Sequence, residues 1–220
     1  RVLREVLDRL SAAVVAGMRT RDVDDLVEQE FRKRGVVASF KGYHGYPASV
    51  CVSINDEVVH GIPGNRVIRE GDVVLLDLGV LHRGFHTDAA VTVGVGEVSA
   101  GARLLMEVTK GALEEGVKFA RAGNYLGDVS MAIQRHVETN GLAVVREYTG
   151  HGVGRELHEE PQIPNFCCGK GPVLRQGMTL AIEPMVTNGG WRTKLAPNRW
   201  TVLTVDGSLA AHFEHTVLVT

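Results

Sequence analysis

Apolar residues near the start of the chain recur every three or four positions, which is the period of an amphipathic helix. Residues 2–15 follow this pattern. Residues 22–34 repeat it, with Asp22 as the expected N-cap and Gly35 as the expected stop. Because the helical pattern begins at Arg1 itself, we expect a short N-terminal segment to precede this residue in the full-length protein.

The pattern changes to that of strands and turns after residue 43. Residues 50–54 are apolar and β-branched, and residues 73–81 (VVLLDLGVL) are almost continuously apolar. A continuous apolar run is typical of a strand that is covered on both faces. Residues 85–95 alternate more loosely, and Arg83 and Gly84 provide a turn, so residues 73–95 are expected to form a hairpin.

The same order of elements then occurs a second time. Ser99 is expected to cap a helix that runs to about residue 121, and Gly141 is expected to end another over residues 127–140. Strands are expected at residues 179–186, 201–205 and 209–219. Two helices followed by strands thus occur in residues 1–98 and again in residues 99–220. The pattern predicts one α+β domain over residues 1–220, in which two αα-ββ halves share an antiparallel sheet with the helices on one face.

Composition narrows the classes of partner. The 220 residues are 44% hydrophobic and 23% charged, and the net charge is −2. These values are ordinary for a globular protein, and they offer no electrostatic basis for binding nucleic acid or an anionic membrane. No apolar run reaches the ~18 residues of a membrane span. Three cysteines form no disulfide framework, so we expect a reducing, cytoplasmic setting.

Single carboxylates interrupt the apolar strands. Asp77 lies within VVLLDLGVL, and Asp88 lies across the expected hairpin in FHTDAA. Glu183 lies in AIEPMV and Glu214 in FEHT. Asp77 could accept backbone N–H groups at a turn, and the two aspartates could be independent surface positions. Burying four carboxylates is unfavourable without a compensating cation, however, and oxygen donors suit hard or borderline divalent ions.

Histidines add candidate nitrogen ligands. His151 and His158 lie in TGHGVGRELHEEP, where the glycines disfavour the HExxH helix of zinc proteases. His60 precedes a Gly-Ile-Pro turn, from which its side chain can point into a cleft. His44 could orient a neighbouring ligand by a hydrogen bond. Each could equally be an ordinary surface or core histidine. The sequence assigns no role to the other five, which are His82, His86, His136, His212 and His215.

The cysteines do not indicate a further site. Cys167 and Cys168 are adjacent and no second pair exists, so they do not match a zinc-binding spacing. We interpret them as surface or structural thiols. Cys51 lies in an expected strand and is predicted to pack there.

The strings VVLLDLGV, FHTDAA, TGHGVGRELHEEP, AIEPMV and FEHT together resemble those of the methionine aminopeptidases. NDEVVHGIP and YHGYPASVCVSIN are similar to type I of that family. The resemblance covers essentially the whole chain. It implies the pita-bread (creatinase/aminopeptidase) fold, a pseudo-twofold α+β domain with helices on the outer face of an antiparallel sheet. It also implies an enzyme that removes the initiator methionine of nascent proteins.

The resemblance further implies a centre of two divalent metal ions held by five residues. Asp88 and Glu214 would bridge the ions. Asp77 would bind one ion, and His151 and Glu183 would bind the other. Co, Mn, Fe, Zn and Ni all suit such a mixed oxygen and nitrogen site.

The same resemblance assigns catalytic roles. Glu183 would shuttle a proton, His60 would contact the scissile nitrogen and the tetrahedral intermediate, and His158 would contact the carbonyl oxygen. Leu157 stands where some type I members carry phenylalanine, so the preference for the second substrate residue is expected to shift. The implied substrate pocket comprises Tyr43, Tyr46, Cys51, His60, Leu157, His158 and Trp200.

The expected partners are the N-terminal methionine peptides of nascent chains, and through them the ribosome. We expect a monomer with no membrane or nucleic-acid site. Two alternatives remain open. One is an X-Pro aminopeptidase or dipeptidase of the same fold, which usually carries an additional N-terminal domain. The other is a non-catalytic binding protein on this scaffold, which would be expected to have lost some of the metal ligands.

Overall fold

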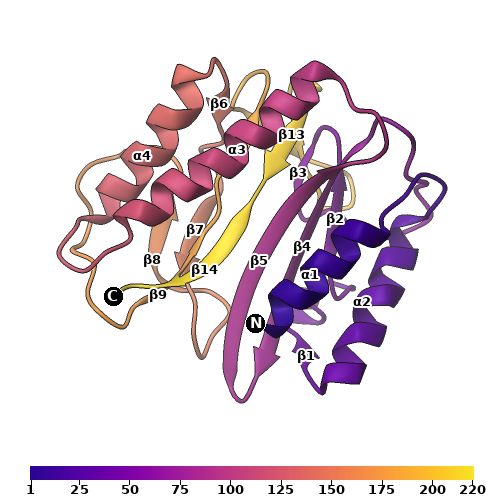
Figure 1. Ribbon diagram of the computed structural model, residues 1–220, viewed down its shortest axis with the longest axis horizontal. Helices are drawn as coiled ribbons and strands as arrows, with labels where there is room; N and C mark the ends of the chain where they lie inside the picture. The colour runs from indigo at the N-terminus through magenta and orange to yellow at the C-terminus, as the bar shows by residue number, and fades with distance from the viewer.

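Four helices lie on one side of a large antiparallel sheet in the computed structural model, which describes residues 1–220 (Figure 1). The helices are α1 (Val2–Ala13), α2 (Thr20–Arg34), α3 (Ala100–Phe119) and α4 (Leu126–Thr139), with a short 3-10 helix at Tyr43–Gly45. The main sheet has eight strands in the order β1-β4-β5-β14-β9-β7-β8, with β2 paired to β4. These strands are β1 (Val37–Ala38), β2 (Cys51–Ile54), β4 (Val73–His82), β5 (Phe85–Gly94), β7 (Thr149–Gly152), β8 (Glu159–Pro164), β9 (Thr179–Ile182) and β14 (Glu214–Leu218).

Two three-stranded sheets accompany the main sheet, and the sequence pattern did not predict them. One comprises β6 (Ala143–Val144), β10 (Met185–Thr187) and β13 (Ala210–His212). The other comprises β3 (Glu57–Val59), β11 (Thr193–Leu195) and β12 (Val202–Thr204). All of these strands have three residues or fewer, which is too short for an alternating pattern to stand out.

The helix ends follow local capping chemistry. The Ser99 hydroxyl accepts the Ala102 N–H at 3.1 Å before α3, and Gly35 ends α2 in the left-handed region, both as predicted. The prediction that Asp22 is the N-cap of α2 was wrong, because the helix begins at residue 20. Asp22 instead lies in the first turn, where its carboxylate accepts the Arg19 N–H at 2.8 Å. It therefore satisfies a free backbone donor from inside the helix.

Each of two expected strands is broken into a pair of strands that belong to different sheets. Residues 179–186 divide into β9 and β10 at Glu183–Pro184, and residues 209–219 divide into β13 and β14 at Phe213. Pro184 has no N–H, so it cannot continue a β ladder. The Phe213 N–H donates to the Pro184 carbonyl at 3.4 Å, and the two breaks therefore lie side by side.

Alternation along the strands separates a helix-facing surface from a second buried surface. Val74, Leu76 and Leu78 of β4 belong to the core that includes the buried faces of α1 and α2. Leu75 belongs to a different cluster, and Asp77 lies on the same face as Leu75. The core under α3 and α4 is formed by other residues, among them the β9 side chains. The sheet is buried on both faces, which explains the continuous apolar run of β4.

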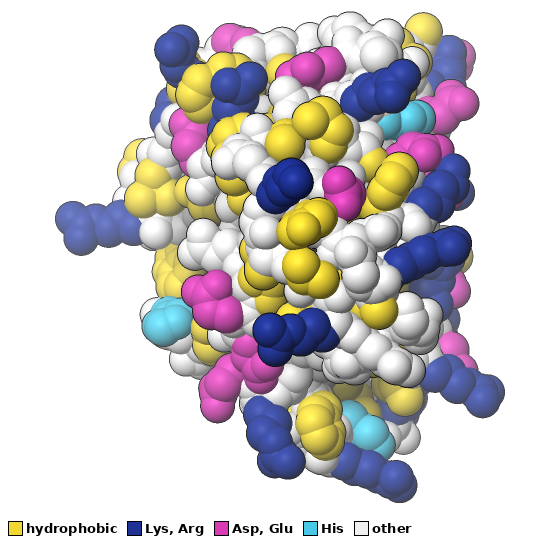
Figure 2. Space-filling view, turned by 90° about the vertical axis from the view of Figure 1, so that its left-hand side faces the viewer, with side chains coloured by type: hydrophobic (Ala, Val, Ile, Leu, Met, Phe, Trp, Pro, Cys, Tyr) yellow, Lys and Arg dark blue, Asp and Glu magenta, His cyan; other side chains and the backbone are white.

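None of the helices is both long enough and apolar enough to span a membrane. On the face shown in Figure 2, basic, acidic and apolar side chains are intermixed. This agrees with the nearly balanced composition of the chain.

Candidate metal centre and active site

The central strands place three carboxylates on the face of the sheet that lies away from the helices. Asp77 in β4 is opposite Ala90 in β5, and Ala90 is opposite Glu214 in β14. Asp88 lies two residues before Ala90, so its side chain points to the same face. The small side chain of Ala90 leaves space between its larger neighbours, and the three carboxylates therefore surround a common position.

Strands β7 and β9 bring the imidazole and the fourth carboxylate to this position. His151 is opposite Ala181, and Glu183 directly follows β9. Nε2 of His151 lies 3.5 Å from Oε1 of Glu183. A Cβ at Gly150 would lie 2.4 Å from the Ala181 carbonyl oxygen. Only glycine permits this close approach of the two strands.

The donor atoms of Asp88, His151 and Glu214 all lie within 4.8 Å of one another. Nδ1 of His151 donates to the Gly152 carbonyl oxygen at 2.8 Å. This hydrogen bond places the proton on Nδ1, so the lone pair of Nε2 faces the carboxylates. A neutral imidazole in this tautomer can bind a metal ion through Nε2.

Asp77, Asp88 and Glu214 are buried, and the Glu183 side chain is 12% exposed. No lysine or arginine lines the site to compensate their charge. Burial raises the pKa of Asp88 to about 7, although the Ala89 N–H at 3.0 Å opposes this shift. Burial, and then the charge of Asp88, raise the pKa values of Asp77, Glu183 and Glu214. Oδ1 of Asp77 and Oε1 of Glu214 are buried and have no hydrogen-bond partner. Unpaired oxygens of this kind fit a divalent cation, which would supply the missing positive charge.

A cavity of about 380 Å³ lies over the cluster. Every residue that the sequence assigned to the site lines it, and so do His44 and Phe40. Phe40 was not predicted, because it lies in a segment without a periodic pattern. The complete lining is Phe40, Tyr43, His44, Tyr46, Cys51, His60, Asp77, Asp88, His151, Leu157, His158, Glu183, Trp200 and Glu214. Their individual roles remain predictions.

One wall of the cavity is apolar. Tyr46, Cys51 and Leu157 are buried in one cluster, against which Trp200 packs. The rings of Tyr46 and Trp200 meet edge to face, with centroids 5.1 Å apart. Cys51 is opposite Asp77 in the sheet, so this wall adjoins the carboxylates. Burial raises the pKa of the Cys51 thiol, which therefore packs as a neutral apolar group.

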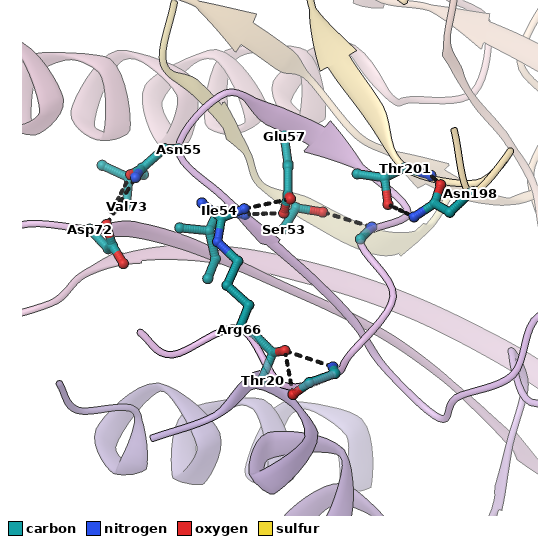
Figure 3. Close-up of polar contacts among 12 residues, drawn as sticks. Thr20, Ser53, Ile54, Asn55, Glu57, Arg66, Asp72, Val73, Asn198 and Thr201 are labelled. Atoms are coloured by element: carbon teal, nitrogen blue, oxygen red, sulfur yellow. Dashed lines mark hydrogen bonds and ion pairs between the residues drawn. The ribbon is translucent and has the colours of Figure 1, made fainter. Parts of the chain in front are cut away.

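His60 lies in a loop that polar contacts hold from several sides. Oγ1 of Thr201 donates to the His60 carbonyl oxygen at 3.4 Å. The N–H of Gly61 donates to Oγ of Ser53 at 3.0 Å, and Figure 3 shows Ser53 and Thr201 in this region. Nδ2 of Asn198 in turn donates to Oγ1 of Thr201 at 2.8 Å. His60 has a positive φ of 60°, a strained conformation that these contacts stabilise. Burial lowers the pKa of His60, so its imidazole is neutral.

Further side-chain contacts hold the chain before and after His60. The side chain of Asn55 donates to Asp72 and accepts the N–H of Val73, each at 2.9 Å. The Thr20 hydroxyl accepts the Gly64 N–H at 2.8 Å. The turn before β3 is therefore attached to the start of β4, and the loop that carries His60 is attached to the start of α2.

His158 lies at the rim of the cavity beside Tyr43. The Tyr43 hydroxyl is 2.8 Å from Nδ1 of His158, and the ring centroids of His158 and His151 are 4.2 Å apart. Burial and then the neighbouring imidazoles, His151 first, lower the pKa of His158 to about 4. The imidazole is therefore neutral near pH 7, and Tyr43 fixes the orientation of its ring.

Two residues beside the cluster were not recognised in the sequence. The Thr216 hydroxyl bonds both the N–H and the carbonyl oxygen of Asp88, each at 2.8 Å. His212 is 1% exposed, and its Nε2 lies 3.8 Å from Oε2 of Glu183. Burial lowers the pKa of His212 to about 3. Their positions in the sequence could have indicated them, because each lies two residues from Glu214.

Known proteins provide a separate line of evidence. A sequence profile of metallopeptidase family M24 matches residues 1–220. The methionine aminopeptidase of Clostridium perfringens is 46% identical over 220 residues, which cover 100% of this chain and 88% of that protein. The crystal structure of the Thermotoga maritima methionine aminopeptidase has a TM-score of 0.98 at 50% identity, over 100% of this chain and 89% of that one. The Pyrococcus furiosus prolidase shares the fold, with a TM-score of 0.80 at 23% identity, over 100% of this chain and 58% of that one.

The chain therefore belongs to metallopeptidase family M24. Its predicted resemblance to the type I methionine aminopeptidases is confirmed by relatives at 46% and 50% identity. The predicted α+β pita-bread fold is confirmed as well.

Proposed function

We propose that this protein is a metal-dependent aminopeptidase that removes the N-terminal methionine of nascent proteins by hydrolysing the first peptide bond. The observation that carries the proposal is a group of four carboxylates and one imidazole beside an apolar pocket, of which Asp77, Asp88, His151 and Glu214 are buried. Two buried oxygens of that group, Oδ1 of Asp77 and Oε1 of Glu214, have no hydrogen-bond partner, and a bound cation would compensate their charge. Membership of a metallopeptidase family with methionine aminopeptidase relatives supports the same conclusion.

Five side chains would hold two divalent ions of Co, Mn, Fe, Zn or Ni. Asp88 and Glu214, from the central strands β5 and β14, would be shared between the ions. Asp77 would bind one ion, and His151 and Glu183 the other. When bound, the ions supply Lewis acidity and lower the pKa of a water molecule, so that hydroxide is available near neutral pH.

The protein side chains then handle the protons and the substrate. Glu183 takes a proton from the attacking water on its carboxylate and passes it to the leaving amine, and its raised pKa suits this task. His60, held neutral by burial, contacts the scissile nitrogen and the tetrahedral intermediate. With Nδ1 accepting from the Tyr43 hydroxyl, His158 keeps its N–H on Nε2, from which it donates to the substrate carbonyl oxygen.

The apolar wall would bind the methionine side chain. An unbranched thioether is flexible and polarisable, and it packs well against aromatic rings such as those of Tyr46 and Trp200. Leu157 is fully buried in this wall at 1% exposure. Because a leucine leaves a differently shaped space from a phenylalanine, we expect Leu157 to influence which second residue the substrate can carry.

Release of methionine from a Met-Ala-Ser peptide tests the proposal. Chelated protein should be inactive, and a divalent ion added back should restore hydrolysis. Full activity after chelation, with metal analysis confirming removal, would contradict the metal mechanism. An X-Pro dipeptide that is hydrolysed faster than Met-Ala-Ser would assign the chain to the prolidase-like alternative. Metal binding without hydrolysis of either peptide would indicate a non-catalytic binding protein.

A further inference from the structure

The structure contains a buried histidine with no apparent partner behind Glu183. His212 ends strand β13, where it is opposite Met185 of β10. Met185 follows Glu183 after Pro184, so the imidazole of His212 lies beside the point at which β9 breaks from β10. Nothing in the ligand set described above uses this imidazole.

The backbone of His212 is fixed from a neighbouring strand. Oγ1 of Thr92 donates to the His212 carbonyl oxygen at 2.7 Å and accepts the His212 N–H at 2.9 Å. Thr92 lies in β5, four residues after Asp88 and on the same face of that strand. The strand that carries one of the acids therefore also sets the position of His212.

The imidazole is placed without an ordinary structural partner. It is 1% exposed, and neither Nδ1 nor Nε2 has a hydrogen bond. An unpaired buried polar group is destabilising, so a purely structural role would be better served by an apolar side chain. Nε2 lies 3.8 Å from Oε2 of Glu183, whereas Oε1 of Glu183 faces His151 at 3.5 Å. The Glu183 carboxylate thus lies between two imidazoles, one at each oxygen.

We propose that His212 is a positioning residue whose Nε2–H holds Oε2 of Glu183 by a hydrogen bond in the metal-loaded enzyme. The inference rests on the proposed role of Glu183 as metal ligand and proton shuttle. A carboxylate restrained at one oxygen keeps the other directed at the ligand cluster, and such outer hydrogen bonds strengthen metal binding. His212 itself neither binds the metal nor contacts the substrate.

Three substitutions separate this role from a packing role. H212Q places an amide N–H close to the position of Nε2, H212N places it nearer to that of Nδ1, and H212L keeps much of the volume without a donor. His82, which is exposed at the end of β4, gives H82L as a matched control. Each variant is titrated in the metal-free form with Mn²⁺ by calorimetry. The kcat and KM for Met-Ala-Ser are then measured at saturating Mn²⁺, and the melting temperature is measured without metal.

We expect H212L and H212N to bind Mn²⁺ about 10- to 100-fold more weakly and to lose a similar factor in kcat, with KM nearly unchanged. H212Q should recover most of both losses. Metal-free H212L should melt at or above the wild-type temperature, because the unpaired nitrogens are gone. H82L should match the wild type throughout.

Wild-type Mn²⁺ affinity and kcat in H212L would overturn the inference. So would losses in H212L that H212Q does not recover, or a melting temperature of metal-free H212L far below that of the wild type. The calorimetric arm does not depend on peptide hydrolysis. A protein that fails to release methionine would therefore refute the proposed function, whereas the metal titrations would still decide the role of His212.

Discussion

The side chain of Thr216 holds the backbone of Asp88 across the boundary between the two halves of the chain. Its hydroxyl accepts the Asp88 N–H and donates to the Asp88 carbonyl oxygen, each at 2.8 Å. The regular pairing of β14 with β5 includes only Glu214 opposite Ala90 and His215 opposite Ala89. The Thr216 hydroxyl therefore replaces the backbone bonds that would otherwise continue the ladder at the position of the acid.

Replacing Thr216 by valine should weaken both stability and metal binding. T216V keeps the shape of the side chain but leaves the N–H and the carbonyl oxygen of Asp88 without this partner, which costs about 1–3 kcal/mol of unfolding free energy. Urea denaturation measures the loss, and calorimetry measures a parallel loss in divalent-metal affinity. T216S retains the hydroxyl and should behave as the wild type. Equal stability of T216V and T216S would show that the bridge is not needed.

The metal-free protein should become less stable as the pH rises above about 7.5. Histidines, whose ordinary pKa is about 6.5, are almost entirely neutral above that pH in both the folded and the unfolded chain, so the buried carboxylates dominate the pH dependence. The pKa of Asp88 is raised to about 7 in the folded state, and those of Asp77, Glu183 and Glu214 are raised as well. The folded state therefore holds protons that the unfolded state has released, and stability is lost as these groups ionise.

Urea midpoints between about pH 7.5 and 9 test this expectation. Each carboxylate can contribute at most about 1.4 kcal/mol per pH unit over its own titration range. Removing one acid with D88N should reduce the slope, and saturating Mn²⁺ should abolish or reverse it. A metal-free protein whose stability rises over this range would contradict the assignment of these carboxylates as protonated, buried groups.

The hydroxyl of Tyr43 should contribute to catalysis through His158. Y43F removes the 2.8 Å hydrogen bond to Nδ1 of His158 but keeps the ring that lines the cavity. We expect kcat to fall about 3- to 10-fold with little change in KM, as for the loss of one neutral hydrogen bond. In an H158A background, Y43F should have no further effect. Additive losses in the double variant would mean that the two residues act independently.

His60 should be needed for catalysis and not for metal binding. It lines the cavity but lies outside the group of converging donor atoms formed by Asp88, His151 and Glu214. H60A should therefore retain a metal content near that of the wild type, while kcat falls by about 10²- to 10⁴-fold. Metal analysis and Met-Ala-Ser kinetics on the same preparation check both points. Retained activity would assign His60 a structural role only.

Local chemistry explains which elements could be predicted. The hydroxyl of Ser99 and the positive φ of Gly35 act on their own helix ends, so both were visible in the sequence. Asp22 was misplaced because a carboxylate serves equally well before the helix and in its first turn. Residues 179–186 were expected as one strand, although Pro184 in the sequence lacks the N–H that a continuous ladder needs. The break at Phe213 has no signal in the sequence, because no residue there prevents a continuous strand.

Within a strand, alternation alone decides which side chains share a face. The sequence therefore already contained the burial of Asp77, Asp88 and Glu214, and the resemblance to a known family named them as ligands. The pairing of β5 with β14, the bridge from Thr216 to Asp88, and the placement of His212 behind Glu183 were decided only in the folded chain. These contacts join residues that are far apart in the sequence, and their register depends on packing in three dimensions. The sequence motifs thus determine which reactive side chains the site contains, and the tertiary structure determines which neighbouring residues orient those side chains.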